Sequence, residues 1–236
     1  DRIFMGRERE SLAMTEAEKE MTAYHEAGHA LCAVLLPKAD PLHKVTIIPM
    51  GMALGVTMQL PEEERHTYPK DYLEDSLVVA MGGRVAEELV FGITSTGANN
   101  DLVTATERAR KMVREWGMSD VVGPMAWGSQ NQVFLGDDLV TGRDYSDETA
   151  RVIDKEVQKI LYAQETRCRD LLNINRSALD LVARSLLEHE TISGKEVARL
   201  IDLASNKEDT APDNGSTIGE KPFIDVESVE DSTSVE

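Results

Sequence analysis

The chain has 236 residues, of which 41% are hydrophobic and 29% are charged, as in an ordinary globular protein of one large domain or two small ones. The formal net charge of −18 argues against a nucleic-acid partner, because a phosphate backbone is bound by basic patches. The sequence contains no stretch of about eighteen apolar residues, so we expect the chain as given to be soluble and to make no direct membrane contact.

The two ends of the chain differ in composition from its middle. Residues 1–13 are charged and aperiodic, and we predict that they are a linker from an upstream module, since Asp1 in place of an initiator methionine indicates a processed or excised fragment. Residues 205–236 carry nine acidic residues against two lysines, which predicts an acidic, disordered tail. The folded domain is therefore expected over residues 14–204.

The first predicted helix begins at a capping box. Thr15 is followed three residues later by Glu18, a pattern in which each side chain bonds the backbone N–H of the other residue. We expect the helix to run to about Leu36, because Pro37 cannot continue it. Apolar residues cover much of its surface, which predicts that this helix is buried.

Two short strands are predicted next. Residues 45–48 form a β-branched run, residues 56–60 alternate apolar with polar side chains, and glycines lie between the two runs. We expect an antiparallel pair, with the second strand at a sheet edge because Pro61 bounds it.

The chain beyond this hairpin is predicted to be largely helical. Start and stop signals place further helices over residues 69–91, 101–116, 146–172, 176–188 and 194–203. Residues 118–145 lack a clear period and are expected to be ordered but irregular, as at an active-site rim or a subunit contact. The expected fold class is therefore mainly α, with a small antiparallel β-hairpin or sheet.

The buried first helix carries the pattern H-E-x-x-H as His25-Glu26-Ala27-Gly28-His29. Helix positions i and i+4 stand on one face, about one turn apart, so two imidazoles there can bind the same zinc ion. The glutamate beside the first histidine can reach a water molecule on that metal. Two histidines satisfied by hydrogen bonds, with Glu26 in an ion pair, are the alternative, but a capped, alanine-rich helix is the context that the zinc motif requires.

Catalytic zinc usually takes three protein ligands, so one more must come from elsewhere in the chain. The continuation of the motif excludes the metzincins, because Leu35 stands where their third histidine is required. His66 follows an acidic, exposed stretch and His189 lies near the far end, so both are expected to be solvated. The spacing alone does not exclude His43.

Two carboxylate positions are better placed. Glu87 and Glu88 occur within an otherwise apolar helical stretch, where Arg84 is the ordinary candidate for their partner. Asp101 stands at a predicted helix start, where aspartate is also common as a cap. The residues alone leave the third ligand open between Asp101 and the Glu87–Glu88 pair.

Three motifs in this order resemble the proteolytic domain of the FtsH family of membrane-anchored, ATP-dependent zinc proteases, over about residues 1–203. The motifs are His25–His29, Gly82–Leu89 and Ser95–Leu102, and residues 1–6 resemble the segment that joins the family's ATPase module to its protease. The resemblance implies that Asp101 is the third zinc ligand, with Glu87 as a supporting or alternative carboxylate. It also implies a helical zinc-peptidase domain with the small sheet near the active site, and assembly as a homo-hexamer.

The resemblance further implies an activity. We expect a zinc-dependent endopeptidase that cleaves unfolded polypeptide, with zinc on His25, His29 and Asp101 activating water and Glu26 acting as general base. The parent protein would be a membrane-anchored quality-control protease with this domain on the cytoplasmic, or equivalent organelle-interior, side. ATP would bind only in an ATPase module, because this sequence has no G-x-x-x-x-G-K-[ST] loop.

The predicted edge strand is a candidate for substrate docking, because an unpaired edge can hold an extended peptide through main-chain hydrogen bonds. Its residues are Gly55, Val56, Thr57, Met58, Gln59 and Leu60. Two other functions stay open on the residues: a non-hydrolytic module that binds metal for structure within a ring, and a stand-alone thermolysin-like zinc peptidase with a glutamate as third ligand.

Overall fold

The structure is a computed structural model that describes residues 14–50, 53–61, 64–127 and 145–208. The predicted capping box is present at its first helix, α2 (Glu16–Leu35). Thr15 Oγ1 accepts a hydrogen bond from the Glu18 N–H at 3.2 Å, and the Glu18 carboxylate accepts one from the Thr15 N–H at 2.8 Å. The predicted linker 1–13 and the segment 128–144 lie outside the described residues.

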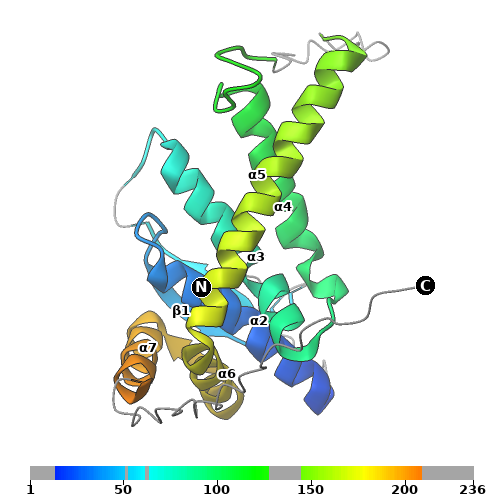
Figure 1. Cartoon of the computed structure of the whole chain (residues 1–236). Helices are drawn as coiled ribbons and strands as arrows, with labels where there is room; N and C mark the ends of the chain where they lie inside the picture. Colours follow the sequence, from blue (N-terminus) through cyan, green and yellow to red (C-terminus); the bar gives the residue numbers. More distant parts are fainter. Residues whose placement is uncertain (1–13, 51–52, 62–63, 128–144, 209–236) are drawn as a thin grey trace, which may run out of the picture.

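Helices make up most of the described chain (Figure 1). After α2 the helices are α3 (Lys70–Phe91), the short 3-10 helix η1 (Thr96–Ala98), α4 (Asn99–Arg114), α5 (Asp147–Ile174), α6 (Arg176–His189) and α7 (Gly194–Glu208). The strands are β1 (Leu42–Thr46), β2 (Val56–Gln59) and β3 (Thr191–Ser193). The prediction of a mainly α fold with a small antiparallel sheet is confirmed. None of the helices in the described part of the chain is both long and apolar enough to cross a membrane.

The three strands form one antiparallel sheet in the order β2-β1-β3, so β2 lies at its edge. Val45 of β1 is opposite Thr57 of β2 on one side and Ile192 of β3 on the other. Val45 and Ile192 are both buried. Strands β1 and β3 therefore contribute side chains to the core, and among the described residues one side of β2 has no neighbouring strand.

The sequence analysis missed β3 and misplaced several element ends. β3 has three residues and only one buried side chain, too short for a period of two to be recognised. The first strand was expected at residues 45–48 but begins at Leu42, because β1 pairs through a bulge between Leu42 and Lys44. Helix α4 begins at Asn99, two residues before the expected start, and α7 continues to Glu208 instead of ending near residue 203.

Helices α2 and α3 touch through their backbones. A Cβ atom at Gly82 would lie 2.6 Å from the carbonyl oxygen of Gly28, and a Cβ atom at Gly28 would collide with the carbonyl oxygen of Gly82. Only glycine permits so close an approach of two helices. Helix α5 packs across α3 and α4, as Figure 1 shows, and leads into α6 and α7 at one end of the molecule. Helix α2 is thus enclosed by α3, α6 and the sheet.

We predict that Gly82→Ala lowers the free energy of unfolding by about 2 kcal/mol, because the added methyl group forces α3 away from α2. The measurement is urea unfolding followed by circular dichroism with a metal chelator present, so that metal binding does not contribute. Ser76→Ala on the same helix is the control and should change stability by less than about 0.5 kcal/mol. Equal stabilities for the two variants would contradict a backbone contact at Gly82.

Candidate metal centre

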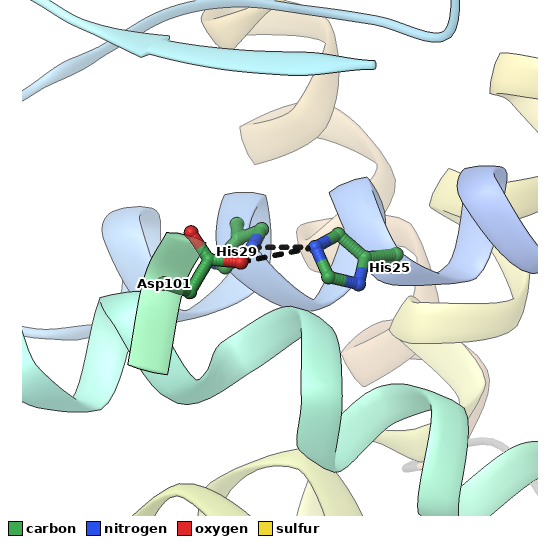
Figure 2. A group of neighbouring side chains, drawn as sticks. All are labelled: His25, His29 and Asp101. Atoms are coloured by element: carbon green, nitrogen blue, oxygen red, sulfur yellow. Dashed lines mark hydrogen bonds and ion pairs between the residues drawn. The ribbon is translucent and has the colours of Figure 1, made fainter. Parts of the chain in front are cut away.

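His25 and His29 lie one turn apart on α2, and their ring nitrogens meet the carboxylate of Asp101 from the first turn of α4. The two Nε2 atoms are 3.0 Å apart, and Asp101 Oδ2 lies 3.3 Å from His25 Nε2 and 3.4 Å from His29 Nε2. One ligand atom from each of the three residues fits within a group no wider than 4.8 Å. Figure 2 shows the two imidazoles and the carboxylate directed toward one another.

The other nitrogen of each imidazole is held by a hydrogen-bond acceptor. His29 Nδ1 donates to the carbonyl oxygen of Val79 at 2.7 Å, and His25 Nδ1 donates to Glu87 Oε1 at 2.7 Å. A carbonyl oxygen can only accept, so the proton of a neutral His29 is on Nδ1 and its lone pair is on Nε2. This arrangement fixes the rotation of both rings, as the outer hydrogen bonds of metal-binding histidines do.

The donor set fits a divalent cation. When both imidazoles are neutral and carry their proton on Nδ1, two Nε2 lone pairs and one carboxylate oxygen face each other. These electron-rich atoms repel unless a proton or a metal cation stands among them. Two imidazole nitrogens and one carboxylate oxygen are ligands that zinc takes in catalytic sites, where its fourth position is left for water. The residues His25, His29 and Asp101 could therefore hold such a metal.

The charges at this cluster are strongly coupled. Burial by itself lowers the pKa of His25, but hydrogen bonds to Asp101 and Glu87 outweigh it and raise the pKa to about 10. Burial raises the pKa of Asp101, but its bonds to His25 and His29 hold that pKa well below its usual range. Protons and a metal ion therefore compete for the same nitrogens, because ligation requires neutral imidazole.

Glu26 is buried between α2 and β2. Thr57 Oγ1 donates to Glu26 Oε2 at 2.6 Å, and a Cβ atom at Gly55 would lie 2.7 Å from Glu26 Oε1. Burial raises the pKa of Glu26, although the two histidines and the Thr57 hydroxyl act in the opposite direction. The start of β2 therefore sets the position of this carboxylate and leaves no room beside it for a larger residue at position 55.

The two glutamates of α3 have different partners. Glu87 is buried and also accepts hydrogen bonds from the N–H and Oγ of Ser95, at 2.8 and 3.1 Å. Burial raises the pKa of Glu87, but His25 and Ser95 lower it more. Glu88 instead pairs with Arg169 of α5 at 2.9 Å, while Arg84, expected as its partner, lies 3.9 Å from Glu165.

The remaining histidines of the described chain lie apart from the cluster. His43, His66 and His189 are all exposed, and none belongs to a group of potential metal ligands among the residues that the structure places. The set that the structure brings together is His25, His29 and Asp101.

The model of peptidase family M41 matches residues 12–200 of the chain. The chain belongs to this family. It is 60% identical over 205 residues to the ATP-dependent zinc metalloprotease FtsH of Acidimicrobium ferrooxidans, covering 87% of this chain and 31% of that protein. The proteins of the same name from Acidobacterium capsulatum and Myxococcus xanthus are 51% and 52% identical, covering 86% and 85% of this chain and 32% of each relative. The resemblance to the FtsH family is confirmed, and the chain spans about a third of the length of these curated relatives.

The sequence analysis did not assign a positioning role to four residues that shape the site of this M41 domain. They are Val79, whose carbonyl orients His29; Thr57, whose hydroxyl holds Glu26; and Gly28 and Gly83, which allow α3 to approach α2. A Cβ atom at Gly83 would collide with the His25 ring. Adjacent glycines inside a predicted helix are a signal of close packing, whereas nothing local to Val79 or Thr57 marks their roles.

Proposed function

We propose that this chain is the proteolytic part of an ATP-dependent zinc metalloprotease and that it hydrolyses peptide bonds in unfolded polypeptide. The observation that carries the proposal is the convergence of His25 Nε2, His29 Nε2 and Asp101 Oδ2 beside the buried carboxylate of Glu26. The name carried by the relatives agrees with this chemistry, because they are called zinc metalloproteases.

The three residues His25, His29 and Asp101 would hold the zinc ion. Zinc in such a site supplies Lewis-acid chemistry, which acidifies water and polarises a carbonyl group. Val79 and Glu87 hold the two rings at Nδ1 and so direct Nε2 toward the metal position. Because these acceptors are a buried carbonyl and a buried carboxylate, the rings cannot rotate away without leaving a hydrogen-bonding group unsatisfied.

Glu26 would be the general base and, in the following step, the general acid. Its carboxylate accepts a proton from the attacking water and returns a proton to the leaving amine. The raised pKa of Glu26 suits this exchange, because a carboxylate that binds a proton too weakly cannot carry it to the amine. The Thr57 hydroxyl donates to Glu26 Oε2 at 2.6 Å, so Oε1 would be the oxygen that accepts the proton of the attacking water.

The edge of β2 would hold the substrate. An extended peptide can add to an unpaired strand edge through main-chain hydrogen bonds, which favours unfolded chains over folded ones and makes few demands on sequence. Because Thr57 ties β2 to Glu26, a peptide on the strand Gly55–Leu60 would pass beside that carboxylate.

As part of the same proposal, we infer the properties of the longer parent protein from its family. The parent would be a membrane-anchored homo-hexamer acting in protein quality control, with this domain on the cytoplasmic or equivalent side. Its domain would comprise residues 14–204, between the linker 1–13 and the acidic tail 205–236. Residues 205–208 of this predicted tail form the last part of α7, and residues 209–236 lie outside the described residues.

Two details argue against the alternative functions. A purely structural metal module has no need of a buried carboxylate oriented by a strand, as Glu26 is by Thr57. A thermolysin-like site needs a glutamate ligand, but Glu87 is engaged by His25 Nδ1 and Ser95, and Glu88 by Arg169. The zinc-peptidase function with an aspartate ligand accounts for all of these contacts.

We predict that Asp101→Asn weakens zinc binding by more than about 100-fold, whereas Glu87→Gln weakens it by about 10- to 100-fold, as expected of a residue that supports a ligand. Glu88→Gln is the control, because Glu88 faces Arg169, and it should bind zinc like the wild type. The measurement is bound zinc per chain after equilibration with a competing chelator. If Glu88→Gln lost zinc while Asp101→Asn kept it, the aspartate would be excluded as the ligand.

We predict that Glu26→Gln keeps one zinc ion per chain but lowers cleavage of an unfolded protein such as casein by at least about 100-fold, because the amide cannot accept the proton. Glu16→Gln, at the exposed start of the same helix, is the matched control and should cleave normally. Both zinc content and initial cleavage rate are measured. Wild-type cleavage by Glu26→Gln would rule out Glu26 as the base.

We predict that a proline at position 57 or 58 raises the KM for a peptide at least about fivefold, because it removes one main-chain donor from the edge strand. Successive N–H groups of a strand point to opposite sides, so one of the two variants affects the free edge and the other the pairing with β1. Thr57→Val separates loss of the hydroxyl from loss of the N–H. Unchanged KM values in both proline variants would exclude docking on β2.

A further inference from the structure

A cavity of about 530 Å³ lies at the end of β2 that is farther from Glu26. Its walls come from the loop before β1, from the segment that follows β2 and from the first turns of α3, and they include Asp40, Pro61, Arg65, Tyr68 and Tyr72. None of these residues belongs to the proposed metal site. The cavity has the size of a binding site for one large side chain or a small ligand.

The Asp40 carboxylate in this cavity has one oxygen that accepts a hydrogen bond and one that has only an ion pair with Arg65. Tyr72 Oη donates to Asp40 Oδ2 at 2.8 Å, whereas Oδ1 is buried and has no hydrogen-bond partner in the described part of the chain. A guanidinium nitrogen of Arg65 lies 3.5 Å from Oδ1, longer than a charge-assisted hydrogen bond of about 2.7–2.9 Å. A buried carboxylate oxygen without a donor is costly, so the cavity favours a cationic donor.

The aromatic wall of the cavity also suits a cation. The Tyr68 and Tyr72 rings are stacked with centroids 5.3 Å apart, and the Arg65 guanidinium carbon lies 4.7 Å over the Tyr72 ring. The faces of tyrosine rings attract cations. Arg65 is partly exposed on a loop, with 38% of its side chain accessible, so it can move aside without unpacking the core. The position of the Arg65 guanidinium in the structure shows that the cavity can accommodate a cationic group beside Asp40 and Tyr72.

Strand β2 connects this cavity to Glu26. Thr57, near the start of the strand, bonds Glu26, while Gln59 Nε2 donates to the Asp40 carbonyl at 2.6 Å and Pro61 lines the cavity. The four residue-to-residue steps from Thr57 to Pro61 span about 13 Å in extended conformation. A peptide that pairs antiparallel with β2 runs the opposite way, so its residue at the cavity would lie about four positions N-terminal to the bond beside Glu26.

We propose that this cavity is a substrate subsite that takes a lysine or arginine side chain about four residues N-terminal to the cleaved bond, in exchange for Arg65. The inference rests on the proposed function, since it takes the substrate to be a peptide docked on β2. The incoming ammonium or guanidinium group would donate to Asp40 Oδ1 and stack on the Tyr68–Tyr72 pair. The subsite would add a preference for basic side chains to an otherwise sequence-tolerant edge.

The test uses two peptides that differ only in lysine or glutamine four residues before the cleaved bond. Their binding to the chain carrying Glu26→Gln is measured by fluorescence anisotropy, and their cleavage by the zinc-loaded chain is measured as kcat/KM. We expect lysine to be preferred by about tenfold, as for one charge-assisted hydrogen bond. Asp40→Asn should bring the ratio close to one, whereas Asp71→Asn, at an exposed position on α3, should keep it.

The outcomes separate the subsite from the proposed function. Equal binding of the two peptides overturns the subsite, as does a lysine preference that appears only C-terminal to the cleaved bond. A lysine preference in binding without cleavage of either peptide supports the subsite and overturns the proposed function. If Asp40→Asn does not fold, Arg65→Gln decides: tighter binding of the lysine peptide supports the exchange with Arg65, and unchanged binding overturns it.

Discussion

The whole site depends on how closely α2 and α3 approach each other. The backbone contact between Gly28 and Gly82 sets this distance, and no other residue type fits there. On α3, Val79 lies nearly one turn before the contact and Glu87 just over one turn after it, so their oxygen atoms meet the two imidazoles of α2 at the same time. If α2 and α3 lay farther apart, the His25 and His29 rings would lose these hydrogen bonds and could rotate, and their Nε2 atoms would no longer converge.

The crossing of α2 and α3 is also connected to Asp101 through a series of hydrogen bonds. Glu87, which accepts from His25, also accepts from the N–H and hydroxyl of Ser95, and Ser95 caps the short helix η1 that leads directly into α4. Asp101 stands in the first turn of α4. One buried carboxylate therefore orients a histidine and fixes the start of the helix that carries Asp101. These hydrogen bonds explain why the Glu87 carboxylate can be kept in the core, where a carboxylate without partners would be unfavourable.

The small sheet has a comparable double role. Strand β1 joins the core through Val45, while β2 holds Glu26 through Thr57 and keeps one edge outside the pairing of the sheet. Exposed strand edges promote aggregation, and proteins tend to shorten or cover them. Here the edge strand is only four residues long, is followed two residues later by Pro61 and leads toward a cavity with a buried carboxylate. A short edge bounded in this way limits association with another sheet.

The sequence alone determined those features of the fold and the site that depend only on residues close together in the chain. The H-E-x-x-H spacing, the cap at Thr15, and the helix ends at Pro37 and Gly92 follow from backbone geometry within a few residues, and they predicted most helices and the histidine pair. The sequence left the choice between Asp101 and Glu87–Glu88 open, and it missed β3. Those questions depend on contacts between distant segments: the glycine crossing turns Glu87 to His25 Nδ1, Arg169 binds Glu88, and Asp101 alone of the three meets both Nε2 atoms. Only the tertiary structure decided these contacts, because no local pattern specifies which side chains a helix crossing brings together.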